Sequence, residues 1–451
     1  MKKLENIYLD HAGATPIDKE VILAMCEVEN LYANPSGIYR RGVEAKNKIE
    51  ESRKIISNIL NCNSSEVIFT GSGTESVNIA LLGYVKNHIL ENQNKIEGID
   101  AKKDFENKTN FTIPKVITTN VEHAAVLESL RHLESMELIE IIYLNVDETG
   151  RVKENELREI LKESGIENKN NIIMVSVMYA NNETGRVQPV KEIGRIIDEY
   201  NRELIKKDDL EKNKVILHID AMQAGNYLDI DIKKLRCDML SMNGSKIYGP
   251  KGIGLLYKNK NINLSPIIYG GGQEGGIRSG TEDLQKIVGL ASAMQIAKEK
   301  RENEVIRLLE LQSYFLNNIQ KEIPEVKIYT YENSKNKIID IRDDEDTAPE
   351  KNIKINYFNL GSLPNNINIG LPNMLSDEMV VRLDYVGFDV SHKSACSSNE
   401  TGEGSYVLRA MGASEKESNE NIRMTMGRDT KLEDIQKLIL EIKNIYKKYK
   451  V

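Results

Sequence analysis

The feature that most constrains the fold is an alternation, from residue 64 to residue 258, of short apolar runs with amphipathic stretches. Each run has the length of a strand and ends in a polar or glycine-rich turn; the runs lie at 64–73, 115–123, 139–147, 171–185, 214–224, 237–246 and 252–258. Helical patterns such as 75–90 and 190–204 separate them. Strands that alternate with helices predict an α/β fold with a mostly parallel central sheet flanked by helices.

The pattern changes in the second part of the chain. A charged helical pattern fills residues 284–320, short apolar runs follow, and an amphipathic helix is predicted at 432–449. A chain of 451 residues is too long for one compact core. We predict a large domain over 16–260 and a smaller C-terminal α+β domain over 261–451, against which residues 1–15 pack.

Two segments show neither the apolar runs of the predicted strands nor the periodic pattern of a helix. Residues 92–112 in the predicted large domain and 331–353 in the small one are polar, charged and aperiodic. We interpret both as surface insertions that form solvated loops.

Charge and hydropathy narrow the class of function. The net charge is −8, so the chain as a whole lacks the basic character that binds nucleic acid or acidic membranes. No run of about 18 apolar residues occurs, and no apolar segment follows the N-terminal lysines, so we predict neither a spanning helix nor a secretory signal. We expect a cytoplasmic protein without direct contact to nucleic acid or membrane.

The four cysteines form no CxxC pair, and their spacing fits neither a zinc site nor a disulfide framework. This usage favours a reducing compartment. Cys26, Cys62 and Cys237 are expected to be small core residues. Cys396 differs, because serines, glycines and polar residues surround it in a loop-like stretch at 390–412.

His392 and Lys393 precede Cys396 closely, and positive charge favours the reactive thiolate. From composition alone, the interpretation of Cys396 as a reactive cysteine is only slightly favoured over that of an incidental cysteine in a loop.

Ligands of parallel sheets bind at the carboxyl ends of the strands, so the residues that follow each apolar run are the first candidates. Lys246 lies in SMNGSKIYGPKGIG, where glycine and serine let the backbone approach a ligand closely. A desolvated lysine has a lowered pKa, and its neutral amine attacks aldehydes. Lys246 is thus a Schiff-base candidate, against the ordinary alternative of a solvated surface charge.

Asp220 ends the apolar run of ILHIDAMQAG, with Gln223 three residues further on. An aspartate in this position is often a helix cap. It is also the group that keeps the ring nitrogen of pyridoxal 5′-phosphate protonated, so that the ring withdraws electrons. The two interpretations are about equally supported by this motif alone.

Three more strand ends carry candidate groups. Gly73 and Thr74 open a helix whose free amides suit a phosphate, and a plain capped helix is the alternative. His123 follows the run KVITTNV, where an imidazole could stack on a ring or fill a structural role. Asn181 and Asn182 could donate to a ring oxygen or form an ordinary turn.

Taken in order, these motifs resemble the cysteine desulfurases of the NifS/IscS group, within the class-V aminotransferases and the fold-type I enzymes that use pyridoxal 5′-phosphate. The resemblance runs from residues 8–16 to 422–430, apart from the two insertions. It comprises YLDHAGATP, ANPSGIYRRG, IFTGSGTES, VEHAAVL, MYANNETG, HIDAMQA, GSKIYGPKGIG, GGGQEGGIRSGT, SACSS and SYVLRAMG. It implies conversion of L-cysteine to L-alanine, with the sulfur passed to an acceptor for iron–sulfur cluster assembly or tRNA thiolation.

The resemblance also implies roles by position. Lys246 would hold the cofactor and remove the substrate proton, and Asp220 would pair with the ring nitrogen. His123 would stack on the ring and take part in catalysis. Gln223 and Asn182 would neighbour the ring oxygen, and Asn182 would also contact the substrate. The residues implied around the phosphate are Gly73, Thr74, Asn243 and Ser245.

Three implied roles involve the substrate, a partner subunit or the acceptor protein. Arg423 would bind the substrate carboxylate, for which a bidentate guanidinium is suited. Thr281 would reach the phosphate site of a second subunit, which implies a homodimer. Cys396 would carry the sulfur as a persulfide to the acceptor protein.

The chain departs from the family pattern at three motifs; in one of them, Ser391, His392 and Lys393 stand where the family has Ser-Ser-Gly before the cysteine. Asn243 and Ser245 replace a serine and a histidine near the phosphate, and Gln273 and Gly275 stand in a segment that usually reads His-Glu-Arg-Gly. These changes concern phosphate affinity and the choice of partner. The alternatives are another class-V enzyme, such as a selenocysteine lyase or an aminotransferase, and a non-catalytic scaffold of the same fold.

Overall fold

The computed structural model describes residues 6–97, 113–166, 171–206, 214–333, 339–342, 352–392 and 404–450. Its strands are β1 (Ile7–Tyr8), β2 (Val67–Thr70), β3 (Lys115–Thr119), β4 (Glu140–Leu144), β5 (Ile172–Met178), β6 (Ile216–Asp220), β7 (Met239–Asn243), β8 (Gly254–Lys258), β9 (Lys327–Ile328), β10 (Ile339–Arg342), β11 (Asn352–Ile355), β12 (Asn366–Gly370), β13 (Phe388–Asp389) and β14 (Asn421–Thr425). Its α-helices are α1 (Lys19–Glu27), α2 (Arg40–Leu60), α3 (Gly73–Glu97), α4 (Ala124–Ser135), α5 (Glu154–Ile166), α6 (Val190–Lys206), α7 (Ile232–Leu235), α8 (Leu284–Glu322), α9 (Ser376–Tyr385), α10 (Tyr406–Ala410), α11 (Glu415–Ser418) and α12 (Leu432–Tyr449).

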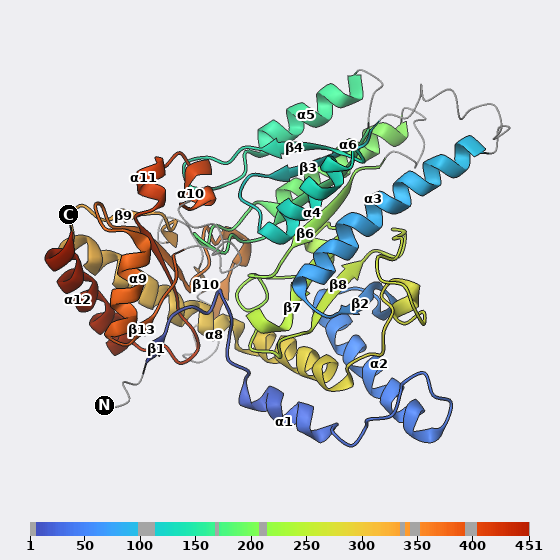
Figure 1. Ribbon diagram of the computed structural model, residues 1–451, viewed down its shortest axis with the longest axis horizontal. Coiled ribbons are helices and arrows are strands. Elements are labelled where there is room, and N and C mark those ends of the chain that lie inside the picture. Colours follow the sequence, from blue (N-terminus) through green and yellow to red (C-terminus); the bar gives the residue numbers. More distant parts are fainter. Residues whose placement is uncertain are drawn as a thin grey trace.

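Seven strands form one large sheet, in the order β2-β8-β7-β6-β5-β3-β4 (Figure 1). β8 runs antiparallel to its neighbours β2 and β7, and every other pair in the sheet is parallel. Each of the seven apolar runs contributes one strand. The prediction of a mostly parallel α/β sheet is therefore confirmed.

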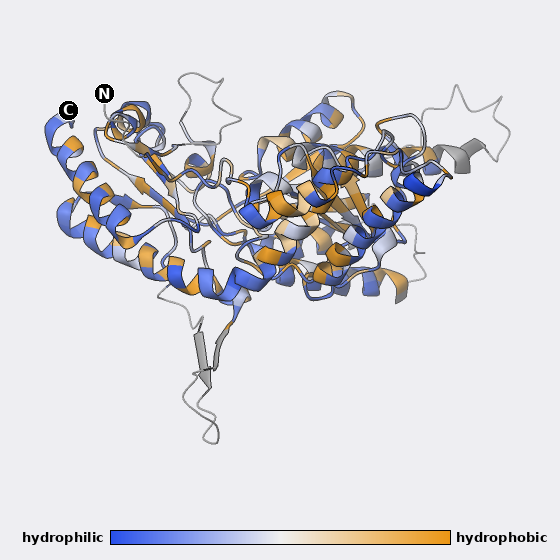
Figure 2. Cartoon of the chain, turned by 90° about the horizontal axis from the view of Figure 1, so that it is seen from below, coloured by the Kyte–Doolittle hydropathy of each residue, from blue (hydrophilic) through white to orange (hydrophobic). Residues whose placement is uncertain are grey.

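The sheet is buried on both faces because its strands are apolar at consecutive positions, which point to opposite sides. In β6, Ile216 packs in the cluster that includes the buried residues of α3 and α4, whereas Leu217 and Ile219 pack in the cluster that includes those of α5 and α6. Figure 2 shows the apolar strands enclosed between helices whose outward faces are hydrophilic. Among the described helices, none is both long and apolar enough to cross a membrane.

A second, three-stranded sheet lies in the C-terminal part, in the order β14-β12-β9, and is antiparallel throughout. β1 pairs in parallel with β13 nearby, through Ile7 and Phe388. The long helix α8 packs against α1 and α2 at one end and against α12 at the other, which links the two sheets (Figure 1). After β1, the N-terminal chain runs toward the carboxyl edge of the large sheet. The domain boundaries inferred from the sequence stay predictions.

The interpretation of both insertions as loops is wrong in part. Helix α3 continues to Glu97 and so includes the first residues of the first insertion. In the second insertion, β10 and β11 pair as antiparallel strands, with Ile339 opposite Ile355. Residues 98–112, 334–338 and 343–351 lie outside the described residues.

The prediction that Cys26 is a core residue is also wrong. Cys26 is exposed on α1, Cys62 is half-buried and Cys237 is buried. Helix α1 buries Val21, and a residue five positions further on lies about 140° around the helix. Cys26 therefore faces away from the core.

Candidate active site

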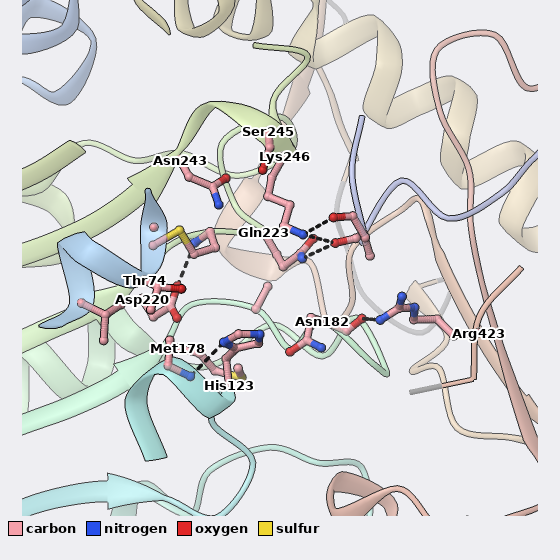
Figure 3. Close-up of a pocket in the computed structure, with 17 residues that line it drawn as sticks. Thr74, His123, Met178, Asn182, Asp220, Gln223, Asn243, Ser245, Lys246 and Arg423 are labelled. Carbon is pink, nitrogen blue, oxygen red and sulfur yellow. Dashed lines mark hydrogen bonds between the residues drawn. The ribbon is translucent and has the colours of Figure 1, made fainter. Parts of the chain in front are cut away.

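A cavity of about 770 Å³, counted to its open mouth, lies where the carboxyl ends of the parallel strands meet. This size is typical of small-molecule sites. The loops after β2, β3, β5, β6 and β7 line it, together with the N-terminal chain and β14 (Figure 3). The predicted site residues that line it are Gly73, Thr74, His123, Asn182, Asp220, Gln223, Asn243, Ser245, Lys246 and Arg423.

Two predicted site residues are not among the lining residues. Thr281 is solvent-exposed in the single chain, and its role toward a second subunit stays a prediction. Cys396 lies outside the described residues. The cavity thus brings together the groups expected around the cofactor and the substrate carboxylate, and their individual roles stay predictions.

Lys246 follows β7 in a single 3-10 turn, and its side chain points into the cavity (Figure 3). Its Nζ donates to the carbonyl oxygens of Ala12, at 2.7 Å, and Gly13. Gln223 Nε2 also donates to Ala12 O, at 3.1 Å. The sequence pattern gave no role to these two carbonyls, since the N-terminal chain meets Lys246 only in the folded protein.

Asp220 ends β6 with its carboxyl group buried. Burial raises its pKa to about 6, although Met222 N–H, which donates to Oδ1 at 3.0 Å, and the positive Lys246 both oppose that rise. A cationic group placed beside this carboxyl would favour its charged form. The two interpretations from the sequence are thus compatible, because Asp220 accepts a local backbone bond and still borders the cavity.

His123 caps helix α4, with Nδ1 accepting from Ala125 N–H at 3.1 Å. Burial, assisted by the charge of Lys246, lowers its pKa to about 4, so the ring is neutral near pH 7. Because Nδ1 accepts, we assign the proton to Nε2. The cap therefore fixes a neutral imidazole at the cavity wall.

Glu122, directly before His123, was not singled out in the sequence. It is fully buried, and its Oε1 accepts from Thr119 Oγ1 at 2.7 Å and from Met178 N at 2.9 Å. Its Oε2 has no partner among the described residues. Burial raises its pKa to about 8, with a smaller contribution from the charge of Asp220. Its position at a strand end, beside a candidate histidine, was the signal available.

We expect the Glu122→Gln variant to gain stability over the wild type as pH rises from about 4.5 to about 8. Over that range the folded protein keeps a proton on Glu122 that the unfolded chain has lost. Wild-type stability should therefore fall by roughly 1.4 kcal/mol per pH unit relative to glutamine, which stays neutral. Urea unfolding of cofactor-free protein at several pH values measures this difference.

The control is Glu128→Gln, which changes a glutamate on the exposed face of α4. A Glu122→Gln difference that stays constant across the whole range would mean that Glu122 is ionised in the folded protein.

Arg423 lies on β14 and is almost fully buried. Its Nη1 donates to Asn182 O at 3.0 Å, and its Nη2 to Asp10 Oδ1 at 2.6 Å. Its Nε has no partner within the described part of the chain. A guanidinium that lines the cavity and keeps an open donor suits an anionic group, and a carboxylate in particular.

The other end of the cavity is formed by the N-terminus of α3. A Cβ at Gly73 would lie 2.6 Å from Met222 Sδ, so a larger residue there would displace the Met222 side chain at the cavity wall. Asn243 Oδ1 on one wall and Asn182 Oδ1 on another are buried and lack hydrogen-bond partners among the described residues. Unsatisfied buried polar atoms of this kind are costly unless a ligand pairs with them.

These residues fit pyridoxal 5′-phosphate. They offer an amine for its aldehyde, a buried carboxyl for its ring nitrogen, a flat imidazole, and a helix N-terminus for its phosphate. A metal ion is not indicated, since the described residues contain no group of three or more histidine, cysteine, aspartate or glutamate side chains that could hold one.

Comparison with known proteins places this arrangement in a family. The model of the family described as aminotransferase class-V matches residues 7–100 and 112–342. A curated protein of Dictyoglomus turgidum, named cysteine desulfurase IscS, is 32% identical over 443 residues, which cover 98% of this chain and 95% of that protein.

Two solved structures are similar over nearly the whole chain. One, titled NifS-like protein, superposes with a TM-score of 0.76 at 28% identity and covers 98% of this chain and 100% of its own. Another, titled SspA in complex with cysteine, gives a TM-score of 0.67 at 27% identity, with 93% and 98% covered.

Proposed function

The chain belongs to the class-V aminotransferase family and is a cysteine desulfurase, and on that premise we propose that it holds pyridoxal 5′-phosphate on Lys246 and passes the sulfur of L-cysteine to Cys396. The observation that carries the proposal is the convergence of Lys246, Asp220 and Arg423 on one cavity. These three groups come from two sheets, and no local motif requires them to meet.

The cofactor, when bound, supplies an electron sink for the carbon next to the substrate amine. Asp220 would keep the ring nitrogen protonated, and the neutral imidazole of His123 would lie against the ring. The N-terminus of α3, with Thr74, and the polar groups of Asn243 and Ser245 would hold the phosphate. The Nζ of Lys246 would hold the cofactor and would accept the Cα proton of the substrate.

Arg423 orients the substrate by its carboxylate. Its guanidinium is anchored to Asn182 O and Asp10, so the carboxylate meets a donor of fixed position. A substrate held at that end presents its thiol on the far side of the Cα atom, away from Arg423. This arrangement leaves the sulfur available to a nucleophile that enters from the cavity mouth.

The sulfur step needs one thiol of the protein. The thiolate of Cys396 attacks the substrate sulfur, an S–S bond forms, and the substrate C–S bond breaks with its electron pair remaining on carbon. A proton then completes the methyl group of alanine, and Cys396 is left as a persulfide. The balance is one cysteine and one thiol in, and one alanine and one persulfide out.

Chain length supports the reach of Cys396. Ser391 pairs through its backbone with Arg423, with Arg423 N–H donating to Ser391 O at 2.6 Å. Cys396 is five residues further on, and five residues span at most about 18 Å. The cavity that contains Arg423 lies within that limit.

The persulfide would serve a sulfur acceptor in iron–sulfur cluster assembly or tRNA thiolation. We also propose a cytoplasmic location, because a reducing compartment would keep Cys396 as a thiol. We also propose a homodimer in which Thr281 reaches the phosphate of the second subunit. An exposed threonine in a polar turn is free to do so.

The decisive experiment is an assay of purified protein with L-cysteine. We expect a yellow protein with a visible absorbance band, and equal amounts of alanine and sulfide when a reducing thiol is present. A colourless protein that gains no band with added cofactor would reject the proposal. So would a yellow protein that releases no alanine.

The Asp220→Asn variant should fold, bind the cofactor and lose roughly 10²–10³-fold in kcat. Asparagine can still accept from Met222 N–H, so the turn is kept, but a neutral amide does not hold the ring nitrogen protonated. Steady-state rates measure the loss of kcat, and the unfolding midpoint shows whether the fold is kept. The control is Asp198→Asn, which removes a surface ion pair with Arg236. Full activity of the Asp220→Asn variant would mean that Asp220 serves only as a helix cap.

A further inference from the structure

Asp10 joins the N-terminal chain to the substrate arginine, a contact that the proposed chemistry uses only to fix the position of the guanidinium. Its Oδ1 lies 2.6 Å from Arg423 Nη2, and the side chain of Arg423 is only 2% exposed. The charge of a buried guanidinium needs a partner, and the carboxylate of Asp10 supplies it before any substrate arrives.

The local backbone fixes where this carboxylate can lie. Asp10 O accepts from Gly13 N–H at 2.9 Å, and this turn brings Gly13 against the aspartate side chain. A Cβ on Gly13 would lie 2.3 Å from Asp10 Oδ2, so the close packing requires glycine. Asp10 is also bridged through its backbone to Thr425, two residues from Arg423 on β14.

A substrate carboxylate that reaches Arg423 therefore meets a cation that is already paired. Nη1 gives one N–H to Asn182 O, Nη2 gives one to Asp10, and Nε has no partner among the described residues. Two carboxylates on one guanidinium repel each other, so part of the attraction is offset. A molecule without a carboxylate does not experience this repulsion.

We propose that Asp10 is a resident counter-ion of Arg423 that limits the affinity of the site for the carboxylate of amino acids, and so favours release of alanine after each turnover. The inference rests on the proposed function, since it takes Arg423 as the carboxylate-binding group. Asp10 acts through Arg423 and is a positioning residue rather than a catalytic one.

The test is the Asp10→Asn variant, in which the amide oxygen can still accept from Nη2 while the negative charge is removed. The probes are L-alanine and ethylamine, which is alanine without its carboxylate. Binding of each to the cofactor-loaded enzyme is followed by the change in visible absorbance. We expect L-alanine to bind roughly tenfold or more tightly than to wild type, as for loss of a like charge about 5–6 Å away. Ethylamine should bind equally to both proteins.

Asp18→Asn is the matched control. Asp18 also pairs an N-terminal residue with an arginine of the C-terminal part, but this arginine, Arg428, does not line the cavity as Arg423 does. It should leave alanine binding unchanged. Kinetics give a second readout: in the Asp10 variant the KM for cysteine should fall, and inhibition by added alanine should strengthen.

Each contrary outcome has a distinct meaning. Unchanged or weaker alanine binding by Asp10→Asn overturns the inference. Weaker binding would mean that Asp10 only holds Arg423 in place, so that its replacement misplaces the guanidinium. Equal tightening for alanine and ethylamine overturns it as well. If Asp10→Asn does not fold, Gly13→Ala displaces the same carboxylate and should tighten alanine binding in the same direction. A wild type that binds cofactor but not alanine would instead count against the proposed function.

Discussion

Replacing Lys246 by alanine is expected to reduce the release of alanine and sulfide from cysteine by roughly 10³-fold or more. The variant loses both the amine that holds the cofactor and the base that takes the Cα proton. No other lysine lines the described cavity. The fold should persist, because the Nζ of Lys246 donates to the backbone carbonyls of Ala12 and Gly13 at the cavity wall and to no packed core element through these bonds.

The measurement combines turnover with a borohydride reduction that fixes the cofactor to its lysine. Wild-type protein should carry the label on the peptide with Lys246, and the alanine variant should carry none. Lys251→Ala is the control, because Lys251 is an exposed lysine in the same turn. A Lys246→Ala variant that turns over cysteine at the wild-type rate would contradict the assignment.

Cys396→Ser should separate binding from sulfur transfer. The variant is expected to bind the cofactor and to change its visible spectrum with cysteine, since those steps use Lys246, Asp220 and Arg423. Desulfurase activity should be lost, because a serine hydroxyl is a far poorer nucleophile than a thiolate and forms no persulfide.

Mass spectrometry identifies the acceptor directly. Wild-type protein treated with cysteine should gain one sulfur atom on the peptide that contains Cys396. Cys26→Ser is the matched control, because Cys26 is an exposed cysteine that does not line the cavity. An extra sulfur on Cys26, Cys62 or Cys237, or an unchanged rate in the Cys396 variant, would show that another group receives the sulfur.

Parts of the fold follow from short-range patterns. The seven apolar runs became the seven strands of the large sheet, and the pattern at 432–449 became α12. The aperiodic segments were less tractable, because β10 and β11 carry only a short apolar–polar alternation, IDIR and NIKI, and pair with each other rather than with a larger sheet. The exposure of Cys26 was equally hard to predict, since it depends on which face of α1 packs inward.

In the candidate site, too, some features follow from local sequence patterns and others depend on tertiary packing. The sequence by itself determined that Gly73, His123, Asn182, Asp220 and Lys246 follow strands, and the common direction of parallel strands then brings such residues to one edge. Local pattern and motif order were sufficient for these.

The tertiary structure alone decided how the remaining parts meet. Asp10 and Arg423 are separated by 413 residues and form an ion pair only because β14 lies beside the N-terminal chain. The raised pKa of Glu122 has the same origin, since it reflects burial among residues from β3 and β5 that no local window contains. Backbone propensity acts over a few residues, whereas charge pairing and desolvation depend on distances that exist only after the chain has folded.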